Sequence, residues 1–156
     1  MNQSDLKSKL NYHPDGYFTW KMSHHGYRAG NRVGSKHRSG YYQAMVEGKR
    51  WQLHRLVFLY HHGYLPEEVD HINGDKQDNR IENLRPATRA QNAWNMKGWV
   101  GNKNVDWIPS RKRWRVMVMK EGKNHFGGYF KNEEEAVNKA RELRNELHGE
   151  YACENL

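Results

Sequence analysis

The sequence predicts an α+β protein built in two parts. Short aromatic and β-branched runs separated by turn triplets indicate antiparallel strands in residues 12 to 53. A polar segment at residues 69 to 95 has the order strand, loop, strand, helix. After it, three further strand-like runs precede one amphipathic segment, which is typical of a three-stranded sheet packed on a single helix.

The first strands lie in "YHPDGYFTW" and "GYYQAMVEGKRWQLH", where "PDG" and "EGK" are turn signals. Between them, "SHHGYRAGNRVGSKHRSG" is rich in glycine, serine and basic residues, so it is either a loop that touches a polyanion or a surface loop without a ligand. The run "LHRLVFLYHHG" at residues 53 to 63 is apolar at helical spacing and predicts a short buried helix that stops at Gly63.

A brief strand ending at Val69 comes next, followed by the polar loop and a second strand within "ENLRPAT". Thr88 is a candidate N-cap for a helix that starts with "TRAQNAWNM". We place the domain boundary after this helix, which gives a first domain of residues 1–97 and a second of residues 98–156.

The second domain begins with three strands that have turns near "PSRK" and "EGKN". Its last helix is predicted to start at the N-cap Asn132, to carry glutamates in its first turn and to stop at Gly149. Residues 99–131 hold eight basic and two acidic side chains, whereas residues 132–156 hold three basic and seven acidic ones. The sheet face that the acidic helix leaves open is therefore predicted to be basic and aromatic.

The overall charge favours a polyanionic partner. The net charge of +8 and the pI of about 9.6 point to nucleic acid ahead of a membrane surface. No apolar run approaches the roughly 20 residues of a spanning helix, and "MNQSDLKSKL" lacks the apolar segment of a signal peptide, so we expect a soluble, cytoplasmic protein. Cys153 is the one cysteine, which excludes a disulfide within the chain and leaves oxygen and imidazole ligands for any metal.

The polar segment "VDHINGDKQDNRIENLRPATRAQNAWN" contains the groups that phosphodiester hydrolysis requires: a base, a metal ligand and a side chain that orients the base. Asp70 and His71 are adjacent at a strand end, so a phosphate could lie between a metal on Asp70 and a base at His71. Asn83 on the facing segment is expected to hold His71 through a ring nitrogen. Asn92 can complete the metal site with a neutral oxygen, and this ligand set suits Mg²⁺ or Mn²⁺.

The stretch "HRLV…VDHINGDKQDNRIENLRPATRAQN" resembles the HNH endonuclease family, in the variant of phage and intron-borne homing endonucleases with the ββα-metal fold, and places the HNH core at residues 54–97. The resemblance implies that His71 is the general base and Asn83 its orienting residue. It also implies that Asp70 and Asn92 bind one divalent cation. Asparagine stands at position 92, where the family often has histidine, which disfavours zinc.

Residues 100–156 are similar to the AP-two/ERF DNA-binding domain, on the "WRVMV", "GGYF", "EEA" and "HGEYA" positions. The resemblance implies a three-stranded sheet in the major groove of double-stranded DNA. Strand alternation would turn Trp114, Val116 and Val118 toward the helix. The expected DNA-contacting residues are then Arg113, Arg115 and Met117, with Lys103, Arg111, Lys123 and Asn124 as further candidates.

Other residues in or near the polar segment also have two possible roles. Arg55 and Arg85 either clamp a phosphate or form surface ion pairs with Glu68 or Glu82. His54 is either a metal or phosphate contact or a structural residue with satisfied hydrogen bonds. Asp75 and Asp78 are expected to shape the loop rather than to bind a metal, because Asp side chains commonly bond to their own turn backbone.

Together these features predict a metal-dependent DNA endonuclease, specifically a free-standing phage homing endonuclease that nicks or cleaves DNA in the cytoplasm of an infected host. The resemblance to the family implies products with 5′ phosphates. Neither a membrane nor a small-molecule cofactor is expected. A non-catalytic, sequence-specific DNA-binding regulator and a structure-selective or packaging-associated phage nuclease are the alternatives. One active site per chain means that cutting both strands needs a dimer or two successive nicks, and the oligomeric state stays open.

Overall fold

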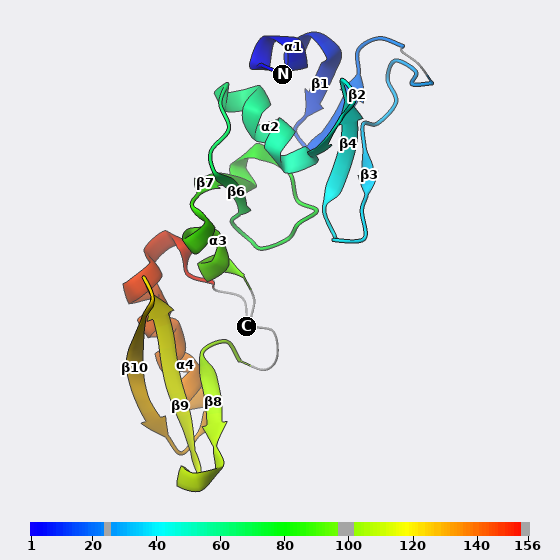
Figure 1. Cartoon of the computed structure of the whole chain (residues 1–156). Coiled ribbons are helices and arrows are strands. Elements are labelled where there is room, and N and C mark those ends of the chain that lie inside the picture. The colour runs from blue at the N-terminus through cyan, green and yellow to red at the C-terminus, as the bar shows by residue number, and fades with distance from the viewer. Residues whose placement is uncertain (24–25, 97–101, 154–156) are drawn as a thin grey trace. The chain divides into compact units, whose positions relative to one another are not determined.

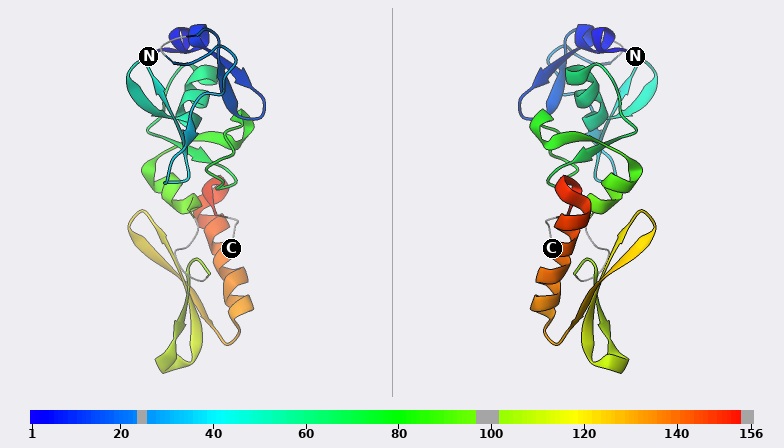
Figure 2. Two further views of the ribbon diagram at one scale, coloured as in Figure 1. Left: turned by 90° about the vertical axis from the view of Figure 1, so that its right-hand side faces the viewer. Right: turned by 90° about the vertical axis from the view of Figure 1, so that its left-hand side faces the viewer.

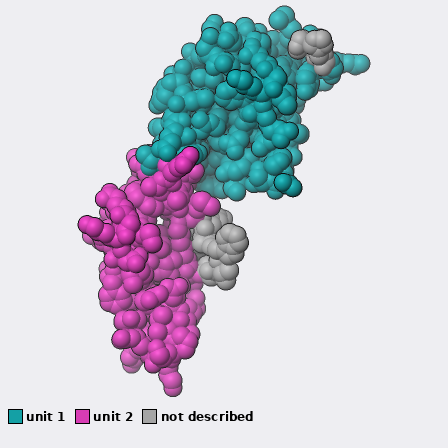
Figure 3. Space-filling view, viewed as in Figure 1, with its two compact units in different colours: residues 1–88 teal, residues 89–156 magenta. Residues whose placement is uncertain are grey.

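The computed structural model describes residues 1–23, 26–96 and 102–153 (Figure 1). Helices and several small antiparallel sheets alternate along the chain, which confirms the α+β class. The chain forms two compact units, residues 1–88 and residues 89–156, coloured separately in Figure 3. The boundary that the sequence suggests, between residues 97 and 98, lies outside the described residues. No helix in the described part of the chain is long and apolar enough to cross a membrane.

The first unit contains two helices, three small sheets and a short 3-10 turn. In chain order its elements are α1 (Gln3–Lys9), β1 (Leu10–His13), β2 (Tyr17–Trp20), β3 (Ser35–Lys36), β4 (Tyr42–Val46), β5 (Lys49–Gln52), α2 (Leu53–His62), β6 (Glu68–His71), η1 (Ile81–Asn83) and β7 (Leu84–Ala87). Strands β1 and β2 form one hairpin, β3, β4 and β5 a three-stranded sheet, and β6 and β7 a second hairpin.

Helix α2 provides the centre of the core in this unit. It ends where the sequence predicts, because Gly63 adopts a left-handed conformation with φ of 78° and its N–H bonds back to Leu59. Leu53, Leu56 and Val57 are fully or almost fully buried among apolar side chains of the surrounding strands. The helix therefore fixes the hairpin of β6 and β7 against the amino-terminal strands.

The β1–β2 hairpin braces the loop between β6 and β7. The hydroxyl of Tyr12 on β1 accepts a hydrogen bond of 3.1 Å from the backbone N–H of Ile81. Gly16, in the turn of the hairpin, has a φ of 82°, and a Cβ at this position would lie 2.5 Å from the backbone nitrogen of Arg80. A side chain at position 16 would thus both strain its own backbone and displace the loop.

The second unit consists of α3 (Arg89–Asn95), β8 (Val105–Ile108), η2 (Pro109–Arg111), β9 (Arg113–Lys120), β10 (Lys123–Phe130), α4 (Glu133–His148) and η3 (Gly149–Tyr151). Its sheet is antiparallel in the order β10-β9-β8, and α4 packs along one side of it (Figure 2). Val116 and Val118 of β9 are fully buried with Ala136 and Ala140 of α4, as strand alternation predicts. Helix α4 also has its expected cap, since the Asn132 side chain accepts from the N–H of Glu134.

Candidate active site

Strand β6 places Asp70 and His71 at the end of a two-stranded hairpin. Antiparallel pairing sets Asp70 opposite Arg85 and His71 opposite Leu84. Because neighbouring residues of a strand point to opposite faces, the Asp70 carboxylate and the His71 ring leave β6 in different directions. Both side chains are buried, with 4% and 5% of their surface exposed. A carboxylate and an imidazole this far from water are expected to have defined partners.

Arg85 is the partner of Asp70. Its Nε and Nη2 both lie 2.8 Å from Oδ2 of Asp70, and the guanidinium is itself buried. Of the two roles that the sequence offers for Arg85, the surface ion pair with Glu68 or Glu82 does not fit, because the guanidinium is buried on Asp70. The cause is the strand register, which places Asp70 and Arg85 directly across from one another on the same face of the hairpin.

Arg55 has a different role from Arg85. Its guanidinium donates from Nη1 to the carbonyl oxygen of Glu67 at 3.1 Å and from Nη2 to that of Pro66 at 3.3 Å. The side chain thus ties the first turns of α2 to the segment that leads into β6. These backbone contacts replace the predicted ion pair with Glu68 or Glu82.

His71 is held by Asn79 of the β6–β7 loop. Its Nε2 lies 3.0 Å from Oδ1 of Asn79, whose Nδ2 donates to the carbonyl of Gln77 at 3.4 Å. Because an amide oxygen only accepts, this bond favours the tautomer with the proton on Nε2 and the lone pair on Nδ1. Burial lowers the pKa of His71 below its ordinary value, against the raising effects of the Asn79 bond and of Asp70. The Asn79 bond therefore fixes the ring and its tautomer, and burial favours the neutral imidazole.

Asn83 does not take the place that the sequence suggests for it, which was a bond to the His71 ring. Its Oδ1 accepts from the N–H of Asn73 at 3.0 Å, and its Nδ2 donates to Oδ1 of Asn73 at 3.0 Å and to the carbonyl of Asp78 at 2.8 Å. The 3-10 turn before β7 directs this side chain into the loop. Asn83 therefore orders the loop that carries Asn79, the residue that bonds to the His71 ring.

The aspartates of the loop shape its backbone, in keeping with the sequence. Oδ1 of Asp75 accepts from the N–H of Gln77 at 2.9 Å. Asp78 forms a two-point ion pair with Arg80, at 2.7 and 2.8 Å, and this bond lowers the pKa of the Asp78 carboxyl to about 2. Both carboxylates are thus used within the loop.

Two further aromatic rings surround His71. His54 of α2 lies 4.8 Å from His71 between ring centroids in an edge-to-face arrangement, and Tyr41 lies 5.2 Å from His54 and 5.9 Å from His71. Among the described residues, Nδ1 of His54 is buried without a hydrogen-bond partner, so the reading of His54 as a satisfied structural residue is wrong for this atom. Burial first, and His71 second, lower the pKa of His54 to about 3.

This shift predicts that folding stability falls in mild acid. The neutral His54 is favoured in the folded chain, so its contribution is complete above the unfolded pKa of about 6.5 and is lost as the pH falls toward 3. We expect the free energy of unfolding to lose about 2 kcal/mol through His54 between pH 7 and pH 5. Urea titrations of the wild type and of His54→Phe at both pH values measure this loss. If both proteins show the same dependence on pH, another group is responsible.

The remaining member of the expected site, Asn92, lies half-buried on α3 and so belongs to the second unit. In the described part of the chain no three His, Cys, Asp or Glu side chains are grouped as a metal site. The oxygen donors that the sequence nominates are one carboxylate, on Asp70, and one amide, on Asn92. A donor set with so few protein oxygens fits a hard cation that keeps most of its waters, such as Mg²⁺ or Mn²⁺.

The residues expected to contact DNA in the second unit fall into two groups. Lys103 forms the first group by itself, because its ammonium group is engaged within the protein. Its Nζ donates to the carbonyl oxygens of Trp94, at 2.7 Å, and Met96, and burial lowers its pKa. It is engaged with the end of α3, because the chain brings it back beside that helix. The others lie on or beside the sheet and are exposed or half-buried: Arg111, Arg113, Arg115, Met117, Lys123 and Asn124. Within this group Arg115 pairs with Asp106 at 3.0 Å.

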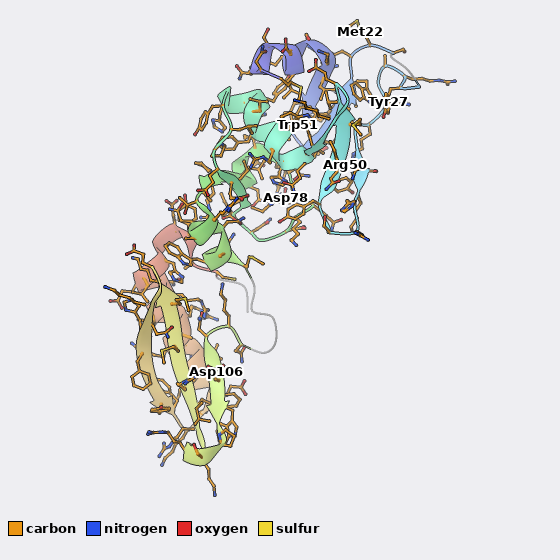
Figure 4. All side chains as sticks on the ribbon, viewed as in Figure 1. Met22, Tyr27, Arg50, Trp51, Asp78 and Asp106 are labelled. Atoms are coloured by element: carbon orange, nitrogen blue, oxygen red, sulfur yellow. The ribbon has the colours of Figure 1, made fainter. Side chains whose placement is uncertain are left out.

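A basic groove lies beside the three-stranded sheet of the first unit, in the region where the sequence offers a loop that touches a polyanion as one of two alternatives. Residues 21–50 carry seven Lys and Arg side chains against one acidic side chain. A cavity of about 590 Å³ is lined by charged and aromatic groups that include Trp20, Tyr27, Arg32, Lys36 and Arg50. Figure 4 labels Tyr27 and Arg50, which belong to the loop after β2 and to β5. The combination of cations and aromatic rings is typical of nucleic-acid surfaces.

Comparison with known proteins gives a match over the segment that contains this site. The HNH endonuclease family model matches residues 52–94. "Protein 3.8" of Escherichia phage T7 is 37% identical over 90 residues, which are 54% of this chain and 72% of that protein. An "Uncharacterized HNH endonuclease L560" of Acanthamoeba polyphaga mimivirus is 36% identical over 121 residues, which are 76% of this chain and 64% of that protein. No solved structure matches. Residues 52–94 thus match the HNH endonuclease family, and the chain is a relative of phage T7 protein 3.8.

Proposed function

We propose that the protein is a metal-dependent DNA endonuclease that hydrolyses phosphodiester bonds with His71 as the general base. The observation that carries this proposal is the setting of His71: a buried imidazole next to Asp70 in the chain, held through Nε2 by Asn79. Burial lowers the pKa of His71, which favours the neutral form. A general base has to be deprotonated before the reaction and to point a lone pair at its substrate. The tautomer that Asn79 favours leaves this lone pair on Nδ1.

In this mechanism the loop residues keep the base ready. His71 takes a proton from the attacking water, and Asn79 preserves the tautomer and orientation of the ring. Asn83 fixes the loop through Asn73 and Asp78, so its contribution to catalysis is to position Asn79. The rings of His54 and Tyr41 limit the positions that His71 can adopt.

Asp70 and Asn92 would hold one Mg²⁺ or Mn²⁺ ion, and Arg85 sets the direction of the Asp70 carboxylate. A bound divalent cation supplies stabilisation of the phosphate charge and of the departing 3′ oxygen, so that the products carry 5′ phosphates. Zinc is disfavoured because neither an imidazole nor a thiolate joins the donor set. The proposed unit is the ββα-metal arrangement, formed by β6, β7 and α3.

DNA would be bound on both sides of this catalytic segment in the sequence. The basic groove of residues 21–50 supports contacts with phosphates, because its charge complements them. We further propose that the β8–β9–β10 sheet is a DNA-binding domain similar to AP-two/ERF, with Arg113 and Arg115 on the face away from α4. We also propose that it is a homing nuclease that acts on double-stranded DNA in an infected bacterial cell. The similarity to a protein of Escherichia phage T7 supports a phage setting.

Cleavage of a supercoiled plasmid tests the proposed function. Purified protein is incubated with plasmid in the presence of Mg²⁺, Mn²⁺ or a chelator, and relaxed and linear products are separated on a gel. We expect cleavage with either metal and none with the chelator. The ratio of relaxed to linear product reports whether one strand or both are cut. Protein that shifts DNA in a gel but cuts neither plasmid nor phage-derived DNA with any metal would instead be a DNA-binding regulator.

A further inference from the structure

Helix α3 is too short to be stable without contacts from other parts of the chain. It has seven residues, Arg89–Asn95, and isolated helices shorter than about 12 residues are marginal in water. Neither acidic residues in its first turn nor basic residues in its last turn complement its dipole. Its conformation must therefore come from packing against other elements.

The second unit supplies that packing through two contacts at the end of the helix. The indole of Trp94 stacks on the imidazole of His148, with ring centroids 4.5 Å apart and planes 3° from parallel. The ammonium group of Lys103 donates to the carbonyl oxygens of Trp94 and Met96, which α3 leaves without intrahelical partners. A cation at this end also complements the helix dipole.

Both contacts are anchored in the body of the second unit. His148, at the end of α4, lies 3.0 Å from the carbonyl of Met119 on β9 through its Nε2, so the stacked ring is fixed to the sheet. Fully buried Arg144 of α4 donates to the carbonyl of Lys103 at 2.9 Å. The contacts that hold α3 therefore connect it to β9, the strand that carries Arg113 and Arg115.

We propose that Trp94, Lys103 and His148 are positioning residues that set the place of Asn92, so that the second unit is part of the catalytic apparatus as well as a DNA-binding module. The inference rests on the proposed role of Asn92 as a metal ligand. Asn92 is two residues from Trp94 on a helix of two turns, so a loss of order at Trp94 reaches Asn92. Residues that orient a metal ligand typically change metal affinity by about 10- to 100-fold when they are replaced.

The test uses the full chain and Mn²⁺ alone as the probe. Mn²⁺ binding to the free protein is titrated by electron paramagnetic resonance, and DNA affinity is measured separately by gel shift in chelator. We expect Trp94→Ala to weaken Mn²⁺ binding by about 10-fold or more and to leave DNA affinity in chelator unchanged. Trp94→Phe keeps a ring for the stack and is expected to retain most of the affinity. Trp107→Ala, which removes an exposed indole of the same unit, is the matched control and keeps wild-type Mn²⁺ affinity.

A double-mutant cycle separates positioning from a general structural effect. If Trp94 acts through Asn92, then Asn92→Ala/Trp94→Ala binds Mn²⁺ no more weakly than Asn92→Ala alone. Additive losses, or wild-type Mn²⁺ affinity in Trp94→Ala, would overturn the inference. Should circular dichroism show that Trp94→Ala is unfolded, His148→Gln replaces it, because glutamine can still donate to the Met119 carbonyl but has no ring to stack.

Failure of this inference is distinguishable from failure of the proposed function. Wild-type protein that does not cleave plasmid under any metal condition removes the nuclease itself. If the wild type cleaves and the Asn92→Ala variant binds Mn²⁺ normally, the nuclease proposal stands. The role of Asn92 as a metal ligand is then refuted, and the inference with it. Cleavage by the wild type, loss of Mn²⁺ in Asn92→Ala and no effect of Trp94→Ala leave the nuclease intact and refute the positioning role.

Discussion

Plasmid cleavage is expected to fall by about 10²- to 10⁴-fold when His71 is replaced by alanine, the range that removal of a general base produces. The variant still has Asp70 and Arg85, so we expect its metal-free DNA affinity to equal that of the wild type. Single-turnover cleavage rates with excess protein measure the chemical step directly. His62→Ala, which removes an exposed histidine of the same unit at the end of α2, is the matched control and should cleave normally.

Two further variants test how much of the cleavage rate depends on the residues that hold the His71 ring. Asn79→Ala removes the acceptor at Nε2 and should lower the rate less than His71→Ala, because the ring remains but both its tautomers become accessible. Asn83→Ala should resemble Asn79→Ala if it works only by ordering the loop. A His71→Ala variant that cleaves at the wild-type rate would assign the base to another residue.

Replacing Arg85 with methionine is expected to have the largest effect on stability. The change removes the cation that neutralises a carboxylate with only 4% of its surface exposed. Breaking one side of a buried ion pair destabilises a protein by about 3–5 kcal/mol. Urea unfolding at pH 7, followed by tryptophan fluorescence, measures the difference in free energy between the variant and the wild type.

The double variant Asp70→Asn/Arg85→Met is the control for this experiment. It removes the buried negative charge together with its partner, so it should recover most of the stability that Arg85→Met loses. Both variants are expected to be inactive as nucleases, because Arg85→Met removes the partner that orients the carboxylate proposed to bind the metal and the double variant also removes that carboxylate. A loss below about 1 kcal/mol in Arg85→Met would mean that the pair behaves like an exposed one.

The sequence predicted the elements whose signals are local, such as apolar residues at regular spacing or a capping residue. The apolar spacing of α2, the alternation of Val116 and Val118 on β9, and the cap at Asn132 all depend on neighbours in the sequence, and the structure agrees with each. Helix α1 was missed because it buries only Leu6 and so has no apolar period to detect.

Contacts that depend on the path of a loop could not be read from spacing. Asn79 and Asn83 both follow His71 in the polar segment, and spacing does not distinguish them. Only the folded loop shows that the Asn79 amide contacts the ring. The pairing of Arg85 with Asp70 requires the register of β6 and β7, and the contacts of Lys103 require the return of the chain to α3. A buried His54 beside His71 had no signal beyond its place on an apolar helix.

The stack of Trp94 on His148 also has a consequence for the order of events during synthesis. The ribosome makes Asp70, His71 and α3 before the β8–β9–β10 sheet. The His148 ring, which packs on Trp94, lies at the end of α4 and is made after that sheet. A nascent chain therefore carries the base and its loop for some time before α3 acquires its packing. Under the positioning role proposed for this stack, an interrupted or partly translated chain would be a poor nuclease, which would protect the DNA of the cell in which it is made.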